Sequence, residues 1–114
     1  AEMFIERGFV YTKLGESDTA LSDYSAAIDY YVQSIRFGNE EAPTYIGTGY
    51  LKRCTLYYQL GKYKEAVSDC TKSILFNPYD PAVYYQRGLA YQTLGKQGEA
   101  NLDFQKYEEL RDPR

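Results

Sequence analysis

The sequence predicts an all-α fold of about six helices, arranged as three tandem helix-turn-helix repeats in one domain over residues 1–114. Three observations support this prediction. A motif with an arginine, a tyrosine four residues later and then a Leu-Gly pair occurs three times. Each copy is followed at a fixed distance by an alanine and an aspartate, and its apolar residues fall at helical spacing. Self-similarity at a fixed period is the signature of a repeat architecture.

The three copies of the motif begin at Arg7, Arg53 and Arg87. The second and third copies lie 34 residues apart, whereas the first and second lie 46 apart, which is one period plus 12 inserted residues. This spacing divides the chain into a first repeat, an extension and two further repeats, at about 1–34, 35–46, about 47–80 and about 81–114.

The first helix of each repeat is predicted from a stripe of apolar or small residues with a spacing of three or four. These stripes are Phe4, Gly8, Tyr11 and Leu14; Tyr50, Cys54, Tyr57 and Leu60; and Tyr84, Gly88, Tyr91 and Leu94. A glycine follows the last leucine of each stripe, where a left-handed helix end favours this residue: Gly15, Gly61 and Gly95.

The second helix of each repeat contains a small residue where it must lie close against the first helix: Ala20, Ala66 and Ala100. The segment Asn77–Pro81 separates the second repeat from the third, because proline does not continue a helix interior. In the third repeat Glu108 stands where the first two repeats have isoleucine, which predicts partial capping of the array by its own last helix.

The extension is predicted to lengthen two helices by one to two turns. The helical pattern of the first repeat continues through Ile35 and Phe37 to Gly38-Asn39, which has the composition of a helix end. The segment Glu40–Pro43 has that of a helix start, because acidic residues and proline are favoured in a first turn. The protruding segment Arg36–Tyr45, here called the tip, is a second candidate contact surface, with a functionally neutral extension as the alternative.

A period of 34 residues with these Gly, Tyr, Leu-Gly, Ala and late Pro positions resembles the tetratricopeptide repeat family. The resemblance covers essentially the whole chain. It implies paired antiparallel helices in each repeat, stacked into a short right-handed superhelix. The lengthened connection between the first two repeats is similar to that of immunophilin-type members.

Composition argues against several classes of partner. The net charge is −3, and the Lys and Arg residues are scattered and form no basic stripe, so we expect no nucleic acid as a direct partner. No apolar run approaches a membrane span, and we expect no membrane insertion. Two cysteines and no Asn-x-Ser/Thr acceptor are consistent with a reducing compartment such as the cytoplasm. The start Ala1-Glu2-Met3 lies inside the first stripe, which suggests a segment of a longer chain.

No enzymatic activity and no cofactor are predicted. The chain has no histidine, the commonest general base, and no glycine-rich phosphate loop. Two cysteines without histidine also fall short of a zinc site. The Gly47-Thr48-Gly49 run lacks the third glycine and the preceding strand of a dinucleotide site, and we expect it to lighten the start of a helix.

Two sets of residues invite both a structural and a functional interpretation. Cys54 and Cys70 fall at positions that should face each other, and we expect two buried thiols that act as small hydrophobic groups; a redox-sensitive bridge is the alternative. The arginine of each motif is followed at a fixed distance by an aspartate, at Asp23, Asp69 and Asp103. We expect half-buried ion pairs that set helix register, rather than a grip on an anionic ligand.

The family resemblance implies that the first helices of the repeats line a concave groove that holds a partner peptide. Position by position, this carries the proposed peptide-binding site over to Ile5, Phe9, Lys13, Leu51, Lys52, Thr55, Tyr58, Tyr85, Gln86 and Leu89. Apolar residues in an exposed concavity mark a binding site. The alternative is burial between neighbouring first helices, which stays open for Leu51 and Leu89.

Co-chaperone members of the family grip the C-terminal carboxylate of heat-shock chaperones with lysine, arginine and asparagine. The lysine and asparagine of the first repeat would fall at Ile5 and Phe9, and the asparagine of the second repeat at Lys52. The lysine and arginine of the third repeat would fall at Ala82 and Gln86, so no position matches in residue type. We therefore expect no capture of a chaperone tail. The leading hypothesis is an adaptor or scaffold that binds a peptide of another protein. The alternative is an assembly segment of a larger protein that self-associates through the tip or the open third repeat.

Overall fold

The computed structural model of the chain describes residues 2–13 and 15–112, and the side chains of all of these except residues 2 and 13. The described residues form six α-helices and no strands. In chain order they are α1 (Glu2–Lys13), α2 (Ser17–Ile35), α3 (Ala42–Gln59), α4 (Tyr63–Phe76), α5 (Pro81–Thr93) and α6 (Gln97–Arg111). The predicted all-α class is confirmed. Leu14, predicted to end the first stripe, lies outside the described residues.

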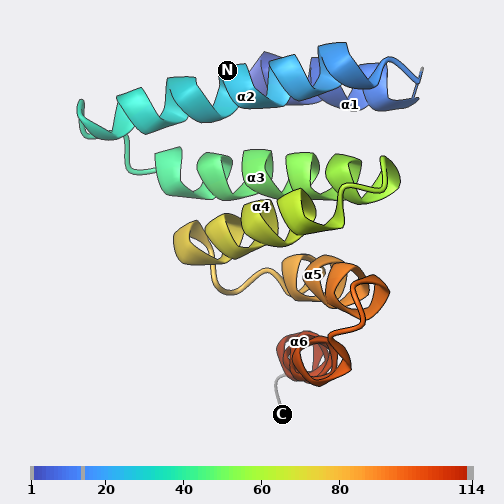
Figure 1. Cartoon of the computed structure of the whole chain (residues 1–114). Helices are drawn as coiled ribbons and strands as arrows, with labels where there is room; N and C mark the ends of the chain where they lie inside the picture. The colour runs from blue at the N-terminus through green and yellow to red at the C-terminus, as the bar shows by residue number, and fades with distance from the viewer. Residues whose placement is uncertain (1, 14, 113–114) are drawn as a thin grey trace.

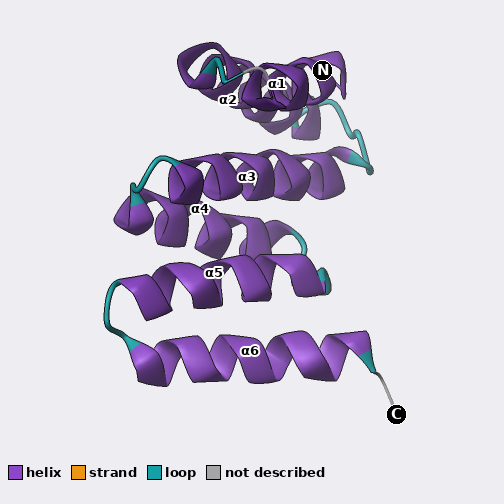
Figure 2. Cartoon of the chain, turned by 90° about the vertical axis from the view of Figure 1, so that its right-hand side faces the viewer, coloured by secondary structure: helices purple, strands orange, loops and turns teal. Residues whose placement is uncertain are grey.

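Successive helices run antiparallel as hairpins, and the hairpins stack in chain order. Figure 2 shows the pairs α1/α2, α3/α4 and α5/α6 as successive layers between the two ends of the chain. Each helix packs mainly on its neighbours in sequence, and the first helices of adjacent hairpins also touch, α1 with α3 and α3 with α5. Within the described ranges, every helix falls short of the length and apolarity that crossing a membrane requires.

The turn inside each hairpin follows from one glycine. Gly61 has φ +77° and Gly95 has φ +79°, a left-handed conformation that side chains with a β-carbon rarely adopt. At the first of these turns the amide of Gly61 donates to the Tyr58 carbonyl, and the amide of Lys62 donates to the Tyr57 carbonyl. This pair of hydrogen bonds satisfies the last carbonyls of α3 and reverses the chain. The predicted glycine helix ends are confirmed.

The extension lengthens two helices, as predicted. Helix α2 has 19 residues and α3 has 18, against 14 in α4 and 13 in α5. Gly38 turns the chain with φ +77°, and α3 starts at Ala42 with Pro43 in its first turn. The α2–α3 turn consequently reaches furthest to the left in Figure 1, clear of the turn between α4 and α5.

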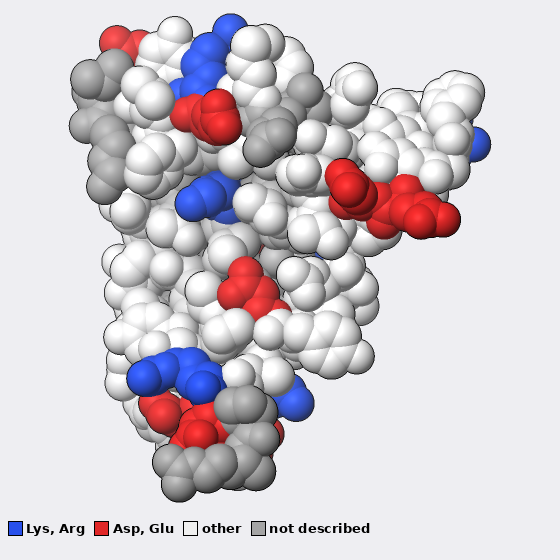
Figure 3. Space-filling view, turned by 180° about the vertical axis from the view of Figure 1, so that it is seen from behind, with Lys and Arg blue, Asp and Glu red and all other residues white. Residues whose placement is uncertain are grey.

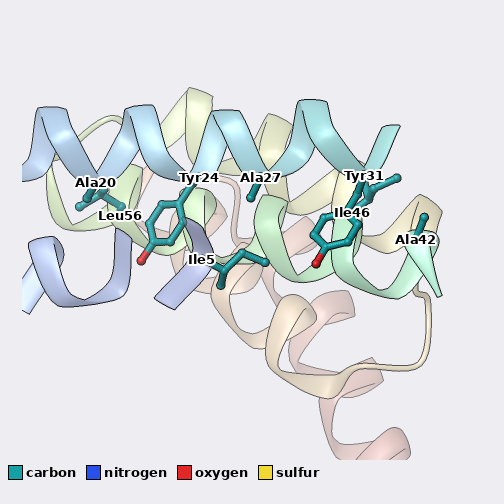
Figure 4. Packing of buried hydrophobic residues seen from close by; sticks show 8 residues of the cluster. All are labelled: Ile5, Ala20, Tyr24, Ala27, Tyr31, Ala42, Ile46 and Leu56. Atoms are coloured by element: carbon teal, nitrogen blue, oxygen red, sulfur yellow. The ribbon is translucent and has the colours of Figure 1, made fainter. Parts of the chain in front are cut away.

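The first part of the core lies between α1, α2 and α3. Figure 4 shows its buried members, which are Ile5, Ala20, Tyr24, Ala27, Tyr31, Ala42, Ile46 and Leu56. The alanines let the helices approach closely, and the rings of Tyr31 and Tyr45 stack with centroids 4.7 Å apart near the tip. This stacking extends the core outwards beneath the tip, so the lengthened part of α2 and α3 is packed rather than loose.

The prediction for the two cysteines is wrong. Cys54 of α3 and Cys70 of α4 face each other, as expected, but they form a disulfide bond instead of two free thiols. The positions are fully buried at the centre of a second core cluster with Ala66, Val83 and Ala90. Disulfides persist mainly under oxidising conditions, so the two cysteines do not support a reducing compartment.

The disulfide replaces a ring contact that the other two hairpins use at the same place. The Tyr24 ring lies over Gly8 and the Phe104 ring over Gly88, so close that a β-carbon on either glycine would lie 2.6 Å from a ring carbon. In the middle hairpin Cys54 stands at the glycine position and Cys70 at the aromatic position. The equivalent helix crossing is therefore filled by a ring on a glycine in the first and third hairpins and by a disulfide in the second.

Each hairpin also contains the predicted ion pair, in bidentate form. In the second hairpin, Nε and Nη2 of Arg53 donate to Oδ2 and Oδ1 of Asp69 at 2.7 and 2.9 Å. The hydrogen bonds to Asp69 are the main cause of a raised pKa for Arg53. The same guanidinium donates through Nη1 to Ser25 of α2 at 3.0 Å. The structural interpretation is confirmed, because these arginines are engaged by carboxylates of the fold.

We expect Arg53→Ala to lower the free energy of unfolding by about 3 kcal/mol, measured by equilibrium urea denaturation. The reason is that the Asp69 side chain, only 4% exposed, would remain as a buried carboxylate without its partner. Arg53→Ala/Asp69→Ala should cost less than the sum of the two single substitutions, because it removes both charges. Additive losses would show that the two side chains contribute independently.

A dithiol reductant should lower the free energy of unfolding of the wild type by about 3 kcal/mol, the value for a closed loop of about 15 residues. The bonded cysteines are 16 residues apart. Cys54→Gly/Cys70→Phe, which copies the ring contact of the third hairpin, should be insensitive to reductant and more stable than Cys54→Ser/Cys70→Ser. Equal stability of the two variants would contradict the equivalence of ring contact and bridge.

Candidate functional site

A cavity of about 550 Å³ opens along the first helices of the three hairpins. Its lining comes from α1, α2, α3, α5 and α6, and comprises Phe9, Thr12, Tyr24, Leu51, Lys52, Thr55, Leu56, Gln59, Ala82, Tyr85, Gln86 and Tyr107. The cavity has the size of a small-ligand or side-chain pocket, and its walls mix aromatic, aliphatic and amide groups. The three hairpins thus contribute to one continuous site.

At the α1 end of the cavity a cation lies over a ring. Nζ of Lys52 is 5.0 Å from the centroid of the Phe9 ring, a separation at which a cation and an aromatic face attract. Leu51 borders the same cavity and also packs against the core cluster around the disulfide. Among the described residues that line the cavity, Lys52 alone carries a charged side chain, so this wall is cationic.

At the α5 end the wall is aromatic. The rings of Tyr85 and Tyr107 have centroids 4.9 Å apart, and Tyr85 also contacts the Phe104 ring at 5.7 Å. Arg111 lies over the Tyr107 ring at 5.0 Å and donates a hydrogen bond to its hydroxyl group at 3.2 Å. These contacts hold a pair of large rings in the wall of the cavity and give this end an aromatic surface.

Two polar groups of the lining have distinct electrostatics. Burial raises the pKa of Tyr24, whose hydroxyl oxygen lies 3.4 Å from Oγ1 of Thr12, so the phenol stays neutral at physiological pH. Nε2 of Gln86 is shielded from water and has no hydrogen-bond partner within the described part of the chain. A buried amide group without an acceptor costs free energy of folding, so Gln86 is an unfavourable feature of the lining.

The structure brings six of the ten predicted site residues to the cavity. These are Phe9, Leu51, Lys52, Thr55, Tyr85 and Gln86. Leu51 both packs against the core cluster around the disulfide and borders the cavity. Whether any of the ten contacts a partner stays a prediction.

The other four predicted residues are not among the described residues that line the cavity. Ile5 is only 8% exposed and belongs to the core between α1, α2 and α3. Tyr58 turns towards α4, where its ring meets Tyr63 edge-on at 5.4 Å, and Leu89 is half-buried away from the cavity lining. The side chain of Lys13 lies outside the described residues.

Sequence reasoning missed Tyr107, because the expected groove was built only from first helices. Tyr107 is in α6, at the position that holds the buried small residues Ala27 in α2 and Ser73 in α4. A large ring at a position where the other copies are small was the available signal. The Tyr107 ring packs on Tyr85 of α5, and both residues border the cavity.

The site shows no arrangement suited to metal chemistry. Over the described residues, no three His, Cys, Asp or Glu side chains gather closely enough to hold a metal ion. The cavity lining contains hydroxyl, amide and ammonium groups but no carboxylate among its members. What this lining offers is apolar surface with a few hydrogen-bonding groups, which suits recognition of a polypeptide segment.

Comparisons with known proteins agree with this architecture. A family model described as "TPR repeat" matches residues 55–95, and one described as "Tetratricopeptide repeat" matches residues 81–112. The chain is 33% identical over 88 residues to Probable serine/threonine-protein kinase BSK3 of Oryza sativa subsp. japonica, covering 77% of this chain and 17% of that protein. It is 30% identical over 97 residues to the human mitochondrial import receptor subunit TOM70, covering 85% of this chain and 15% of that protein.

The chain thus spans about a sixth of the length of these curated relatives. Among solved structures, the first TPR of Spaghetti (RPAP3), bound to the HSP90 peptide SRMEEVD, is similar with a TM-score of 0.77 and 28% sequence identity. That match covers 95% of this chain and 76% of the other. With its 34-residue period, its stacked hairpins and these matches, the chain belongs to the tetratricopeptide repeat family.

Proposed function

We propose that this chain is a non-catalytic protein-interaction module that binds an extended peptide segment of a partner in the cavity along α1, α3 and α5. The observation that carries the proposal is the continuity of the cavity, which receives side chains from the first helices of all three hairpins. A peptide lying across them would meet Phe9 and Lys52 at one end and Tyr85 at the other. For a groove of this size we expect micromolar affinity, about −8 kcal/mol.

The solved relative supports a peptide as the class of ligand. The first TPR of Spaghetti is bound to a peptide and shares its fold with this chain at a TM-score of 0.77. The side chains at the expected ligand positions differ, however. Ile5 is buried in the core, and Phe9 and Ala82 have no charged or amide group to hold a carboxylate. We therefore propose an internal peptide segment, rather than a terminal carboxylate, as the ligand.

The chemistry of the walls defines what such a segment should contain. The Tyr85–Tyr107 pair offers a platform for one large apolar side chain. Lys52, the charged side chain of the described lining, favours an acidic residue nearby. An apolar anchor next to an acidic residue is therefore the motif we propose.

Peptides selected from a random display library on the immobilised chain should be enriched in this motif, and Tyr85→Ala should weaken their binding at least about tenfold. The platform loses one of its two rings in this variant. Binding is measured by fluorescence anisotropy, with circular dichroism to confirm the fold. Tyr79→Ala is the matched control, because Tyr79 is 77% exposed and lies outside the cavity. An equal loss in both variants, or none in Tyr85→Ala, would contradict the site.

The peptide SRMEEVD with a free C-terminus should bind this chain at least about 100-fold more weakly than it binds the Spaghetti domain, measured side by side by calorimetry. The physical reason is the loss of charge-assisted hydrogen bonds to the terminal carboxylate. Amidation of the peptide should change its residual affinity little. Tight binding that amidation abolishes would show that this chain grips a terminal carboxylate after all.

A further inference from the structure

We propose that the groove also accepts the tip of a second copy of this chain, so that copies associate head to tail. The ligand-binding face is the groove of the proposed function, on which this inference therefore rests. The element that enters the groove is the tip, Arg36–Tyr45, which comprises the turn after α2 and the first residues of α3. The interaction would be heterologous, because tip and groove are different surfaces, and each copy would carry one of each.

The tip presents a large apolar side chain in an unusual place. Residues 36–41 are all exposed, and Phe37 is 88% exposed at the outermost turn. Tyr30 and Ile35 of α2 are also exposed, at 55% and 44%, so further apolar side chains are exposed on the helix that leads into the turn. Contiguous exposed apolar surface is characteristic of a contact site.

The tip is held in shape rather than left loose. The amide of Asn39 donates to the Ser34 carbonyl, and the amide of Glu41 donates to Oδ1 of Asn39 at 3.1 Å. Below them, Ala42 is buried and Tyr45 stacks on Tyr31, which anchors the turn to the core. A preorganised turn loses little conformational entropy when it binds, so it is a favourable ligand.

The chemistry of the tip matches the motif that the groove favours. Phe37 is the apolar anchor for the platform of Tyr85 and Tyr107. Glu40 and Glu41 follow it within four residues and would face the cationic wall at Lys52. Arg36 adds one opposite charge, so carboxylates predominate on the tip. Figure 3 shows acidic side chains gathered on the protruding part of the molecule, which stands clear of the stacked body.

The tip does not reach the groove of its own copy. Glu41 directly precedes α3, and Leu51 borders the cavity from the same helix. Ten residues of helix separate them, which is about 15 Å along a rigid rod. The complementary surfaces can therefore meet only between two copies.

The open end of the array is a weaker candidate for self-association. The face of α4 that receives α5 includes Val67 and Ile74, but the corresponding positions of α6 are Asn101 and Glu108. Both α6 residues are exposed, and Glu108 pairs with Arg111 at 3.4 Å. A polar outer face is the property of a capping helix, so another hairpin has little apolar surface to cover here.

The test is sedimentation velocity of the chain from micromolar to millimolar concentration. We expect the mean mass of the wild type to rise with concentration, and Phe37→Ser to weaken this self-association at least about tenfold. Tyr79→Ser is the matched control, since it removes an exposed ring outside the tip and the cavity. A wild type that stays monomeric, or a Phe37→Ser variant that assembles like the wild type, would overturn the proposal.

Mixing two variants identifies the geometry. Phe37→Ser keeps an intact groove, and Tyr85→Ala keeps an intact tip, so an equimolar mixture should form a one-to-one dimer and grow no further. Each variant alone should self-associate at least about tenfold more weakly than the wild type. Should Tyr85→Ala be misfolded, Lys52→Glu replaces it, and Glu41→Lys on the other copy should restore the contact. A mixture without dimers would overturn the insertion of tip into groove.

The outcomes separate this inference from the proposed function. If display-selected peptides bind in a Tyr85-dependent way while the wild type stays monomeric, only the head-to-tail contact is wrong. If no peptide binds and the chain still assembles through Phe37 and Tyr85, the groove is an assembly site, and the adaptor function is wrong. A peptide covering residues 34–45, closed to a turn by linking its ends, should compete with assembly if the proposal holds.

Discussion

One guanidinium group joins three helices at each step of this array. Arg53 of α3 holds Asp69 of α4 in a bidentate pair and reaches back to Ser25 of α2. Arg87 repeats the arrangement one hairpin later and donates to Thr71 of α4 at 3.2 Å. Tyrosine rings flank these pairs: the Tyr50 ring centroid lies 5.4 Å from the Arg53 guanidinium, a separation at which a cation and a ring attract. Because a planar donor fork accepts few geometries, the pair sets both the register within a hairpin and the position of the next hairpin.

The groove depends on this positioning. Residues one turn or less from each arginine, namely Leu51, Lys52, Tyr85 and Gln86, border the cavity. The close crossing inside each hairpin is maintained either by an aromatic ring on glycine or by the disulfide, and the disulfide lies beside the cavity-lining Thr55. A covalent bond in the middle hairpin thus supports the helix that contributes most to the site.

A shared fold does not determine which ligand a groove prefers, because that preference comes from the side chains that line it. Here the groove combines aromatic rings with a single cationic wall, and the tip combines an aromatic ring with two carboxylates. On the two proposals together, a partner peptide and a second copy compete for one groove. Partner binding would then depend on the concentration of the chain itself, because self-association occupies the same surface.

The sequence by itself determined the helices, their glycine turns, the lengthened α2 and α3, and the ion pairs such as Arg53–Asp69, because periodicity and helix-end chemistry are local and repeat three times. Only the tertiary structure decided how half-buried side chains are used. It bonded Cys54 to Cys70, buried Ile5 in the core, turned Tyr58 towards α4 and brought Tyr107 of α6 into the groove. The direction of such side chains depends on how closely and at what angle helices cross, and that geometry is set by contacts between residues distant in the chain.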